Sequence, residues 1–192
     1  MNRGLLEYLR HHTELLHSHL DDHKILKVLV NNKLTTEEYI TSLQALYPPQ
    51  KALEINLVSA LSLYFPSYQY TLRYPLIEKD LIQLNEQPAD NPILELNISN
   101  PSMALGILYV LEGSKLGGRY ILRCLSDKHL PTAFFQSAIH DQASGWKGFT
   151  ELTTIKNIDE EQVVSAAKVA FECFIDSLQS MSRNRTQGMN YA

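Results

Sequence analysis

The chain has 192 residues, of which 44% are hydrophobic, and a formal net charge of −4. A chain of this length buries roughly 70% of its unfolded surface, so it can form one domain with a substantial core. The negative charge disfavours non-specific binding to nucleic acid. Because no signal sequence and no apolar run of about 18 residues is present, we expect a cytoplasmic protein that does not enter a membrane.

Helical periodicity extends over nearly the whole chain, and no segment alternates convincingly between apolar and polar residues as a strand would. We therefore predict an all-α, single-domain multi-helix bundle over residues 1–182, followed by a flexible C-terminal tail at residues 183–192. The cysteines Cys124 and Cys173 fall in predicted helices and form no CxxC pair. Two cysteines placed in this way predict two reduced, half-buried thiols.

The first predicted helix covers residues 4–23, where leucines recur at spacings of three and four. The second covers residues 35–64 and starts with a capping-box sequence. Pro48 and Pro49 lie inside this second segment. Because proline lacks an amide hydrogen and clashes with the preceding turn, we expect the pair to interrupt or kink the helix.

A third helix is predicted at residues 75–84, and a polar loop follows it. The loop contains Pro88, Asn91, Pro92 and Asn97. The next long helix is predicted at residues 101–126, where Ser99 and Asn100 are candidate N-caps and Pro101 suits the first helical position.

The C-terminal third is predicted to contain one short and one long helix. The short helical segment follows Pro131, and the two glycines within residues 145–148 predict a turn after it. The long helix is predicted to begin at Asp159, where Gln162 completes a weak capping box, and to end near Ser182.

Glycines form a stripe along the predicted helix at residues 101–126. With about 100° per residue, Gly113 and Gly117 each lie about 20° from Gly106, on either side of it. Glycine costs roughly 1 kcal/mol relative to alanine inside a helix, so this face approaches something closely. The stripe is explained either by tight packing against another helix or by a flat ligand lying against exposed backbone.

The first helix is rich in histidine. It carries His11, His12, His17, His19 and His23. His17 borders the apolar stripe of the helix, whereas His19 points about 200° away from His17. A histidine in the position of His17, beside a core face, is most often structural. His19 and His23 have the i, i+4 spacing of a zinc pair, although no third ligand is evident nearby.

Two segments together resemble the haem oxygenase family, and especially its bacterial, biliverdin-producing branch. Residues 9–17, LRHHTELLH, resemble the family's first helix, in which a threonine stands four residues before the histidine that ligates haem iron. Residues 108–119, LYVLEGSKLGGR, resemble the distal helix, whose glycines lie over the haem. The central segment from Phe65 to Leu81 and the segment 145–171 are also similar, so the resemblance spans roughly residues 5–180.

The resemblance implies an enzyme that cleaves haem to biliverdin, CO and iron, with haem as both cofactor and substrate. It assigns His17 as the axial ligand of the haem iron and places Thr13 beside it. It also assigns Gly113, Gly117 and Gly118 to the haem-covering wall. O₂ would bind at the open sixth position of the iron. Electrons would come from a separate ferredoxin or flavoprotein reductase.

One position departs from the family pattern. Many members have an aspartate that organises water where this chain has Ser114, so Ser114 and Gly113 become the candidate catalytic positions.

Arg10 and Lys168 are candidate partners for the haem propionates, and Arg73 is expected to pair with Asp80.

Two alternatives remain at this point. The first is a haem-binding or carrier protein on the same scaffold that does not turn haem over, and Ser114 is the residue that favours it. The second is a thiaminase-like bundle, or a helical interaction protein, that does not bind haem.

Overall fold

The computed structural model describes residues 3–89, 95–140 and 145–188. This part of the chain contains helices and no strand, which confirms the predicted class. The elements are α1 (Arg3–Asp22), α2 (Lys24–Lys27), the 3-10 helix η1 (Val28–Val30), α3 (Thr36–Tyr64), α4 (Tyr74–Gln83), α5 (Pro101–Leu125), α6 (Ala133–His140), α7 (Gly145–Leu152) and α8 (Glu160–Gly188). None of the described helices is both long and apolar enough to cross a bilayer.

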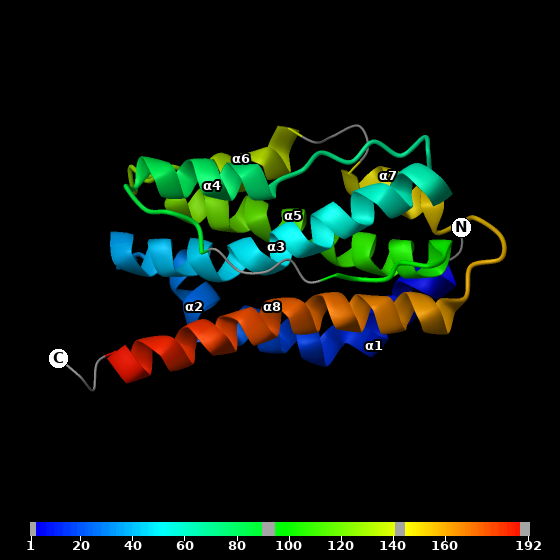
Figure 1. Ribbon diagram of the computed structural model, residues 1–192, viewed down its shortest axis with the longest axis horizontal. Coiled ribbons are helices and arrows are strands. Elements are labelled where there is room, and N and C mark those ends of the chain that lie inside the picture. Colours follow the sequence, from blue (N-terminus) through cyan, green and yellow to red (C-terminus); the bar gives the residue numbers. More distant parts are fainter. Residues whose placement is uncertain (1–2, 90–94, 141–144, 189–192) are drawn as a thin grey trace.

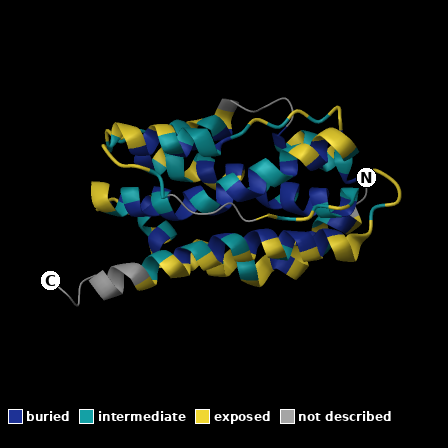
Figure 2. Ribbon diagram, in the orientation of Figure 1, coloured by how far each residue is buried: buried dark blue, intermediate teal, exposed yellow. Residues whose placement is uncertain are grey.

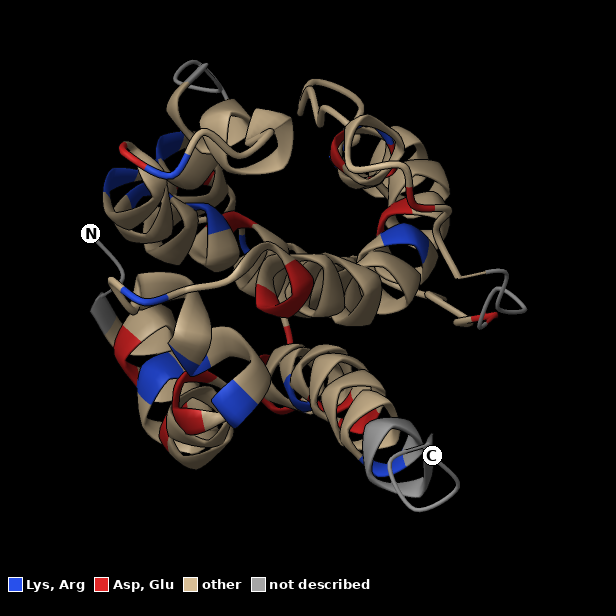
Figure 3. Cartoon of the chain, turned by 90° about the vertical axis from the view of Figure 1, so that its left-hand side faces the viewer, with Lys and Arg blue, Asp and Glu red and all other residues tan. Residues whose placement is uncertain are grey.

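The long helices are stacked in layers (Figure 1). Helices α1 and α8 run along one side, α3 and α5 occupy the middle, and α4, α6 and α7 cover the other side. The most extensive packing joins α8 to α5 and to α1, and the contacts of α3 with α8 and of α5 with α6 come next. Buried residues line the surfaces between these layers, whereas the outward face of α8 is largely exposed (Figure 2). Acidic and basic residues are interspersed over the helices in the end-on view of Figure 3.

Helix α3 continues through both prolines, so of the two predicted outcomes, an interruption or a kink, the interruption is wrong. Thr35 and Glu38 form the predicted capping box at its start. Pro49 cannot donate to the carbonyl of Ala45 one turn earlier. The hydroxyl of Ser177 on α8 donates to that carbonyl at 2.7 Å instead. Tertiary packing thus supplies a hydrogen bond that the helix lacks.

The helix at residues 101–126 is confirmed, and Asn100 is its N-cap, with a side chain that accepts from the amide of Met103. The third helix begins one residue before its predicted start. Asn91 and Pro92 of the predicted loop lie outside the described residues.

Two predicted boundaries in the C-terminal third are wrong. Residues 145–148 open helix α7 and do not form a turn. This short helix is held by packing, because Trp146 and Phe149 contact each other and both contact Tyr109 of α5. Helix α8 starts beside Asp159 as predicted, but it continues to Gly188, beyond Ser182.

Gly106 lies where α5 meets α8. A Cβ atom at this position would come within 2.2 Å of the carbonyl oxygen of Val163 and 2.8 Å of the Ala166 side chain. The absence of a side chain therefore lets two helices pack together. Of the two explanations for the glycine stripe, helix packing applies to Gly106.

Candidate functional site

A cavity of about 630 Å³ lies between α1 and α5. Helices α3, α6, α7 and α8 close its remaining sides. Its walls are mainly apolar and include Leu46, Phe134, Phe135, Trp146, Phe171 and Phe174. A concave apolar cavity of roughly 300–1,000 Å³ with a few polar groups is typical of a small-molecule site.

Helix α1 contributes the wall that carries His17. The His17 side chain is 61% exposed and lines the cavity, and its Nδ1 lies 3.0 Å from a carboxylate oxygen of Asp21. Its ring makes an edge contact with Phe171 of α8, with 5.9 Å between ring centroids. Because Asp21 engages Nδ1, the other ring nitrogen, Nε2, is the one available to a ligand.

Two more α1 residues predicted to be in the site also line the cavity. Thr13 is buried, and its hydroxyl donates to the backbone carbonyl of Leu9 at 2.8 Å. Arg10 is exposed and brings a positive charge to the cavity. Lys168 lies on α8 and is not among the residues that line the cavity.

Helix α5 forms the wall that contains the remaining glycines. A Cβ atom on Gly113 would meet only Trp146, at 3.7 Å, and one on Gly117 would meet nothing within 4 Å. Gly118 is buried against Ala138 and Phe135. The stripe therefore has two roles, because Gly106 packs against a helix whereas Gly113 and Gly117 leave backbone open to the cavity.

A buried arginine, Arg73, also lines the cavity, although its sequence spacing predicted a pair with Asp80. Arg73 is 2% exposed, and its guanidinium donates to the hydroxyls of Ser137 at 3.0 Å and Ser114 at 3.2 Å. The guanidinium also lies over the ring of Phe134, 4.4 Å from its centroid.

The expected pair between Arg73 and Asp80 is wrong. Both carboxylate oxygens of Asp80 accept hydrogen bonds from the start of α6, at the amides of Ala133 and Phe134. Asp80 is thus a helix cap, and burial raises the pKa of its carboxyl group although these amides act in the opposite direction. The partner amides lie more than 50 residues along the chain, which is why local spacing could not reveal them.

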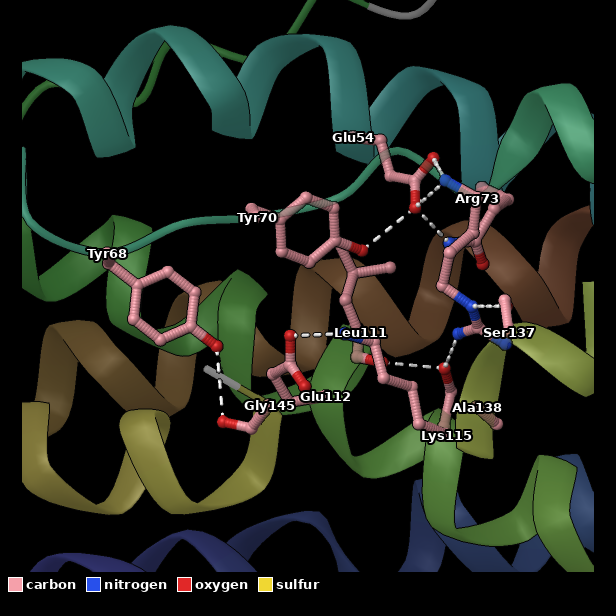
Figure 4. A network of polar contacts seen from close by, with 12 residues as sticks. Glu54, Tyr68, Tyr70, Arg73, Leu111, Glu112, Lys115, Ser137, Ala138 and Gly145 are labelled. Atoms are coloured by element: carbon pink, nitrogen blue, oxygen red, sulfur yellow. Dashed lines mark hydrogen bonds and ion pairs between the residues drawn. The ribbon is translucent and has the colours of Figure 1, made fainter. Parts of the chain in front are cut away.

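Glu54 is a buried residue next to Arg73 that no sequence pattern indicated. It accepts hydrogen bonds from Gln50, from the hydroxyl of Tyr70, and from the backbone amides of Arg73 and Tyr74. Figure 4 shows that this carboxylate fixes the backbone of Arg73 at the start of α4. Burial and the adjacent carboxylate raise the pKa of Tyr70 well above its usual value.

The remaining candidates lie apart from the cavity. His23 accepts a hydrogen bond from the amide of Ile25, and no group of three metal-ligating side chains occurs within the described residues, so a zinc site with His19 gains no support. Cys124 and Cys173 are both unpaired and half-buried, as predicted.

Sequence similarity covers almost the whole chain. The family model described as Heme oxygenase matches residues 3–180. The protein named Heme oxygenase PigA from Pseudomonas aeruginosa is 28% identical over 164 residues, which are 80% of this chain and 82% of that protein. A Heme oxygenase from Xanthomonas campestris pv. campestris is 38% identical over 86 residues, 43% of this chain, and this match spans half of the relative's length.

Two solved structures share the fold. The crystal structure of the NO- and CO-bound heme oxygenase from Neisseria meningitidis aligns with a TM-score of 0.71 and 23% identity, over 92% of this chain and 91% of that one. The crystal structure of heme oxygenase-1 from the cyanobacterium Synechocystis, in complex with heme, aligns with a TM-score of 0.71 and 17% identity, over 98% and 96% of the two chains.

Proposed function

This chain belongs to the haem oxygenase family, and we propose that it binds haem in the cavity between α1 and α5 and cleaves it oxidatively to biliverdin, CO and iron. The observation that carries the proposal is the arrangement of two opposed walls around one apolar cavity. His17 lies on the α1 wall, and the bare backbone of Gly113 and Gly117 lies on the α5 wall.

The residues present fit a flat macrocycle with a metal at its centre. Imidazole is a common axial ligand of haem iron, and only one protein ligand is required when the sixth position stays open for O₂. We assign that ligand to Nε2 of His17. Asp21 would hold the ring in place through Nδ1, as the outer partners of metal-bound histidines commonly do.

Charge at the mouth of the cavity supports an orientation for the substrate. Arg10 lines the cavity and is exposed, so we assign it to a haem propionate. Lys168 stays a weaker candidate because it does not line the cavity.

Bound haem supplies the iron that activates O₂, and its porphyrin is the group that is oxidised. The protein's part is to orient the ring, exclude bulk water with its aromatic walls and hold polar groups near the open side of the iron. On the α5 wall, Ser114 is an exposed polar residue that lines the cavity. Electrons are assigned to a separate ferredoxin or flavoprotein reductase.

A haem carrier on the same scaffold is the second candidate. The observation that favours it is the Ser114 hydroxyl, which donates to the carbonyl of Leu111 at 2.7 Å rather than to a group in the cavity.

Titration of the purified protein with ferric haem tests the binding site. We expect one haem per chain and the absorption spectrum of a histidine-ligated haem, and we expect His17→Ala to lose that spectrum. His12→Ala, on the same helix, is the control and should keep it. If His17→Ala retains the iron–imidazole signal while His12→Ala loses it, the assignment is wrong.

A further inference from the structure

We propose that Arg73 is a positioning residue for the open side of the haem: it fixes the Ser114 hydroxyl so that its hydrogen can turn from the Leu111 carbonyl to an oxygen or halide ligand in the cavity. The inference rests on the proposed function, because it concerns a ligand on haem iron. It adds a residue from outside α5 to the machinery of that site.

The hydrogen bonds at Ser114 define what its hydroxyl can do. A serine hydroxyl has one hydrogen and two lone pairs. One lone pair accepts from Arg73 at 3.2 Å, and the hydrogen is donated to the Leu111 carbonyl at 2.7 Å. In this arrangement Ser114 offers the cavity an acceptor and no donor.

The bond to Leu111 can be given up without leaving a buried group unsatisfied. Within α5 the Leu111 carbonyl also accepts from the backbone amide four residues later, as in any α-helix. Rotation about the Cβ–Oγ bond then redirects the hydrogen, while the oxygen stays in place because Arg73 holds it. The positive charge on the donor also polarises the hydroxyl and makes it a stronger donor itself.

Arg73 is suited to this task because it is fixed at both ends. Its backbone amide donates to Glu54 at 2.9 Å, and its Nε donates to Ser137 at 3.0 Å. The guanidinium is further confined by the Phe134 ring. A planar group with several donors can hold Ser114 and Ser137 together, whereas the single ammonium of lysine cannot reproduce that geometry.

Fluoride binding to the ferric haem complex tests this inference without turnover. Fluoride is a small anion that accepts hydrogen bonds, so its affinity reports the donor on the open side of the iron. We expect Ser114→Ala and Arg73→Met each to weaken fluoride binding about tenfold, the worth of one hydrogen bond to a charged acceptor. The double variant should be no weaker than either single variant, because Arg73 acts through Ser114.

Three further variants separate positioning from charge and from folding. Arg73→Lys keeps the charge and should still lose most of the fluoride affinity. Ser137→Ala keeps both Arg73 and Ser114 and should lose part of the fluoride affinity. This variant tests the positioning role of Arg73 if Arg73→Met does not fold. Arg119→Met is the control, because Arg119 lies on α5 but donates to the Ala138 carbonyl and does not line the cavity.

Several results would overturn the inference. Unchanged fluoride affinity in Ser114→Ala would show that its hydroxyl is not the donor. Additive losses in the double variant would show that Arg73 does not act through Ser114. Full affinity in Arg73→Lys would show that Arg73 acts by its charge alone. If the wild-type protein does not bind haem, the proposed function fails and the inference fails with it, whereas normal haem binding with unchanged fluoride affinity in every variant refutes only the inference.

Discussion

Replacing Gly106 and Gly117 by alanine should change the stability of the ligand-free protein in opposite directions. Both glycines lie on α5, and both substitutions exchange the same hydrogen for a methyl group. Their surroundings differ, because the added Cβ would lie 2.2 Å from a backbone oxygen of α8 at Gly106 and would meet nothing within 4 Å at Gly117.

The magnitudes follow from helix propensity and packing. Alanine is favoured over glycine by about 1 kcal/mol inside a helix. At Gly117 this gain is unopposed, and for a chain of this size it corresponds to a rise in Tm of about 2–4 °C. At Gly106 overpacking costs about 3 kcal/mol, the upper end of the usual range, because the clashing atom belongs to a helix backbone. The net loss of about 2 kcal/mol lowers the Tm by about 4–8 °C.

Thermal unfolding followed by circular dichroism measures both effects, and haem affinity gives an independent readout. Gly117→Leu should keep most of the added stability and weaken haem binding at least tenfold, because a leucine side chain would fill part of the cavity. A Tm that rises in Gly106→Ala would refute the assignment of this glycine to helix packing. Haem affinity that is unchanged in Gly117→Leu would show that the open backbone at Gly117 does not face the ligand.

Three further predictions follow from single contacts. Asp21→Asn should weaken haem binding about tenfold, because a metal-bound histidine depends on its outer partner, which for His17 is Asp21. Asp22→Asn alters only an exposed pair with Lys27 and should leave haem binding unchanged. Equal effects of the two substitutions in a haem titration would contradict the role of Asp21. Ser177→Ala should lower the free energy of unfolding in urea by about 1 kcal/mol, because it removes the donor to the α3 carbonyl that proline leaves free. Ser165, which is exposed on the same helix, is the control, and an equal loss in Ser165→Ala would argue against the contact. Burial raises the pKa of Tyr39 in the folded protein, so its contribution to stability is fully present below the unfolded pKa of about 10 and is lost as the pH rises above it. Urea midpoints between pH 8 and pH 11 should therefore fall less steeply for Tyr39→Phe than for the wild type, and identical slopes would contradict this linkage.

The parts of the site that could be predicted from sequence lie on single helices. His17 and Thr13 are four residues apart on α1, and Gly113 and Gly117 are four residues apart on α5, so helical periodicity alone places each pair on one face. The resemblance to the family then indicates that the two faces oppose each other. Long helices with strong caps, such as α5 after Asn100, were predicted to within a residue or two.

The parts that could not be predicted depend on partners distant in sequence. Arg73 and Asp80 are seven residues apart, which suggested a pair, but each is taken by a different contact to α5 or α6. Residues 145–148 were predicted to form a turn because they contain two glycines. Only the aromatic packing onto α5 makes them helical. Composition also gave no reason to assign different roles to Gly106 and Gly117. Their roles differ because α8 packs against Gly106 and not against Gly117.

Single turnover of the ferric haem complex tests the central claim most directly. The complex is reduced with a ferredoxin and its reductase in the presence of O₂, with catalase added to remove free peroxide, and the absorption spectrum and released CO are followed. The proposed function predicts loss of the haem spectrum with formation of biliverdin and an equivalent amount of CO. A protein that binds haem through His17 and accepts electrons, yet forms no biliverdin and no CO, would contradict the claim and identify the chain as a haem carrier.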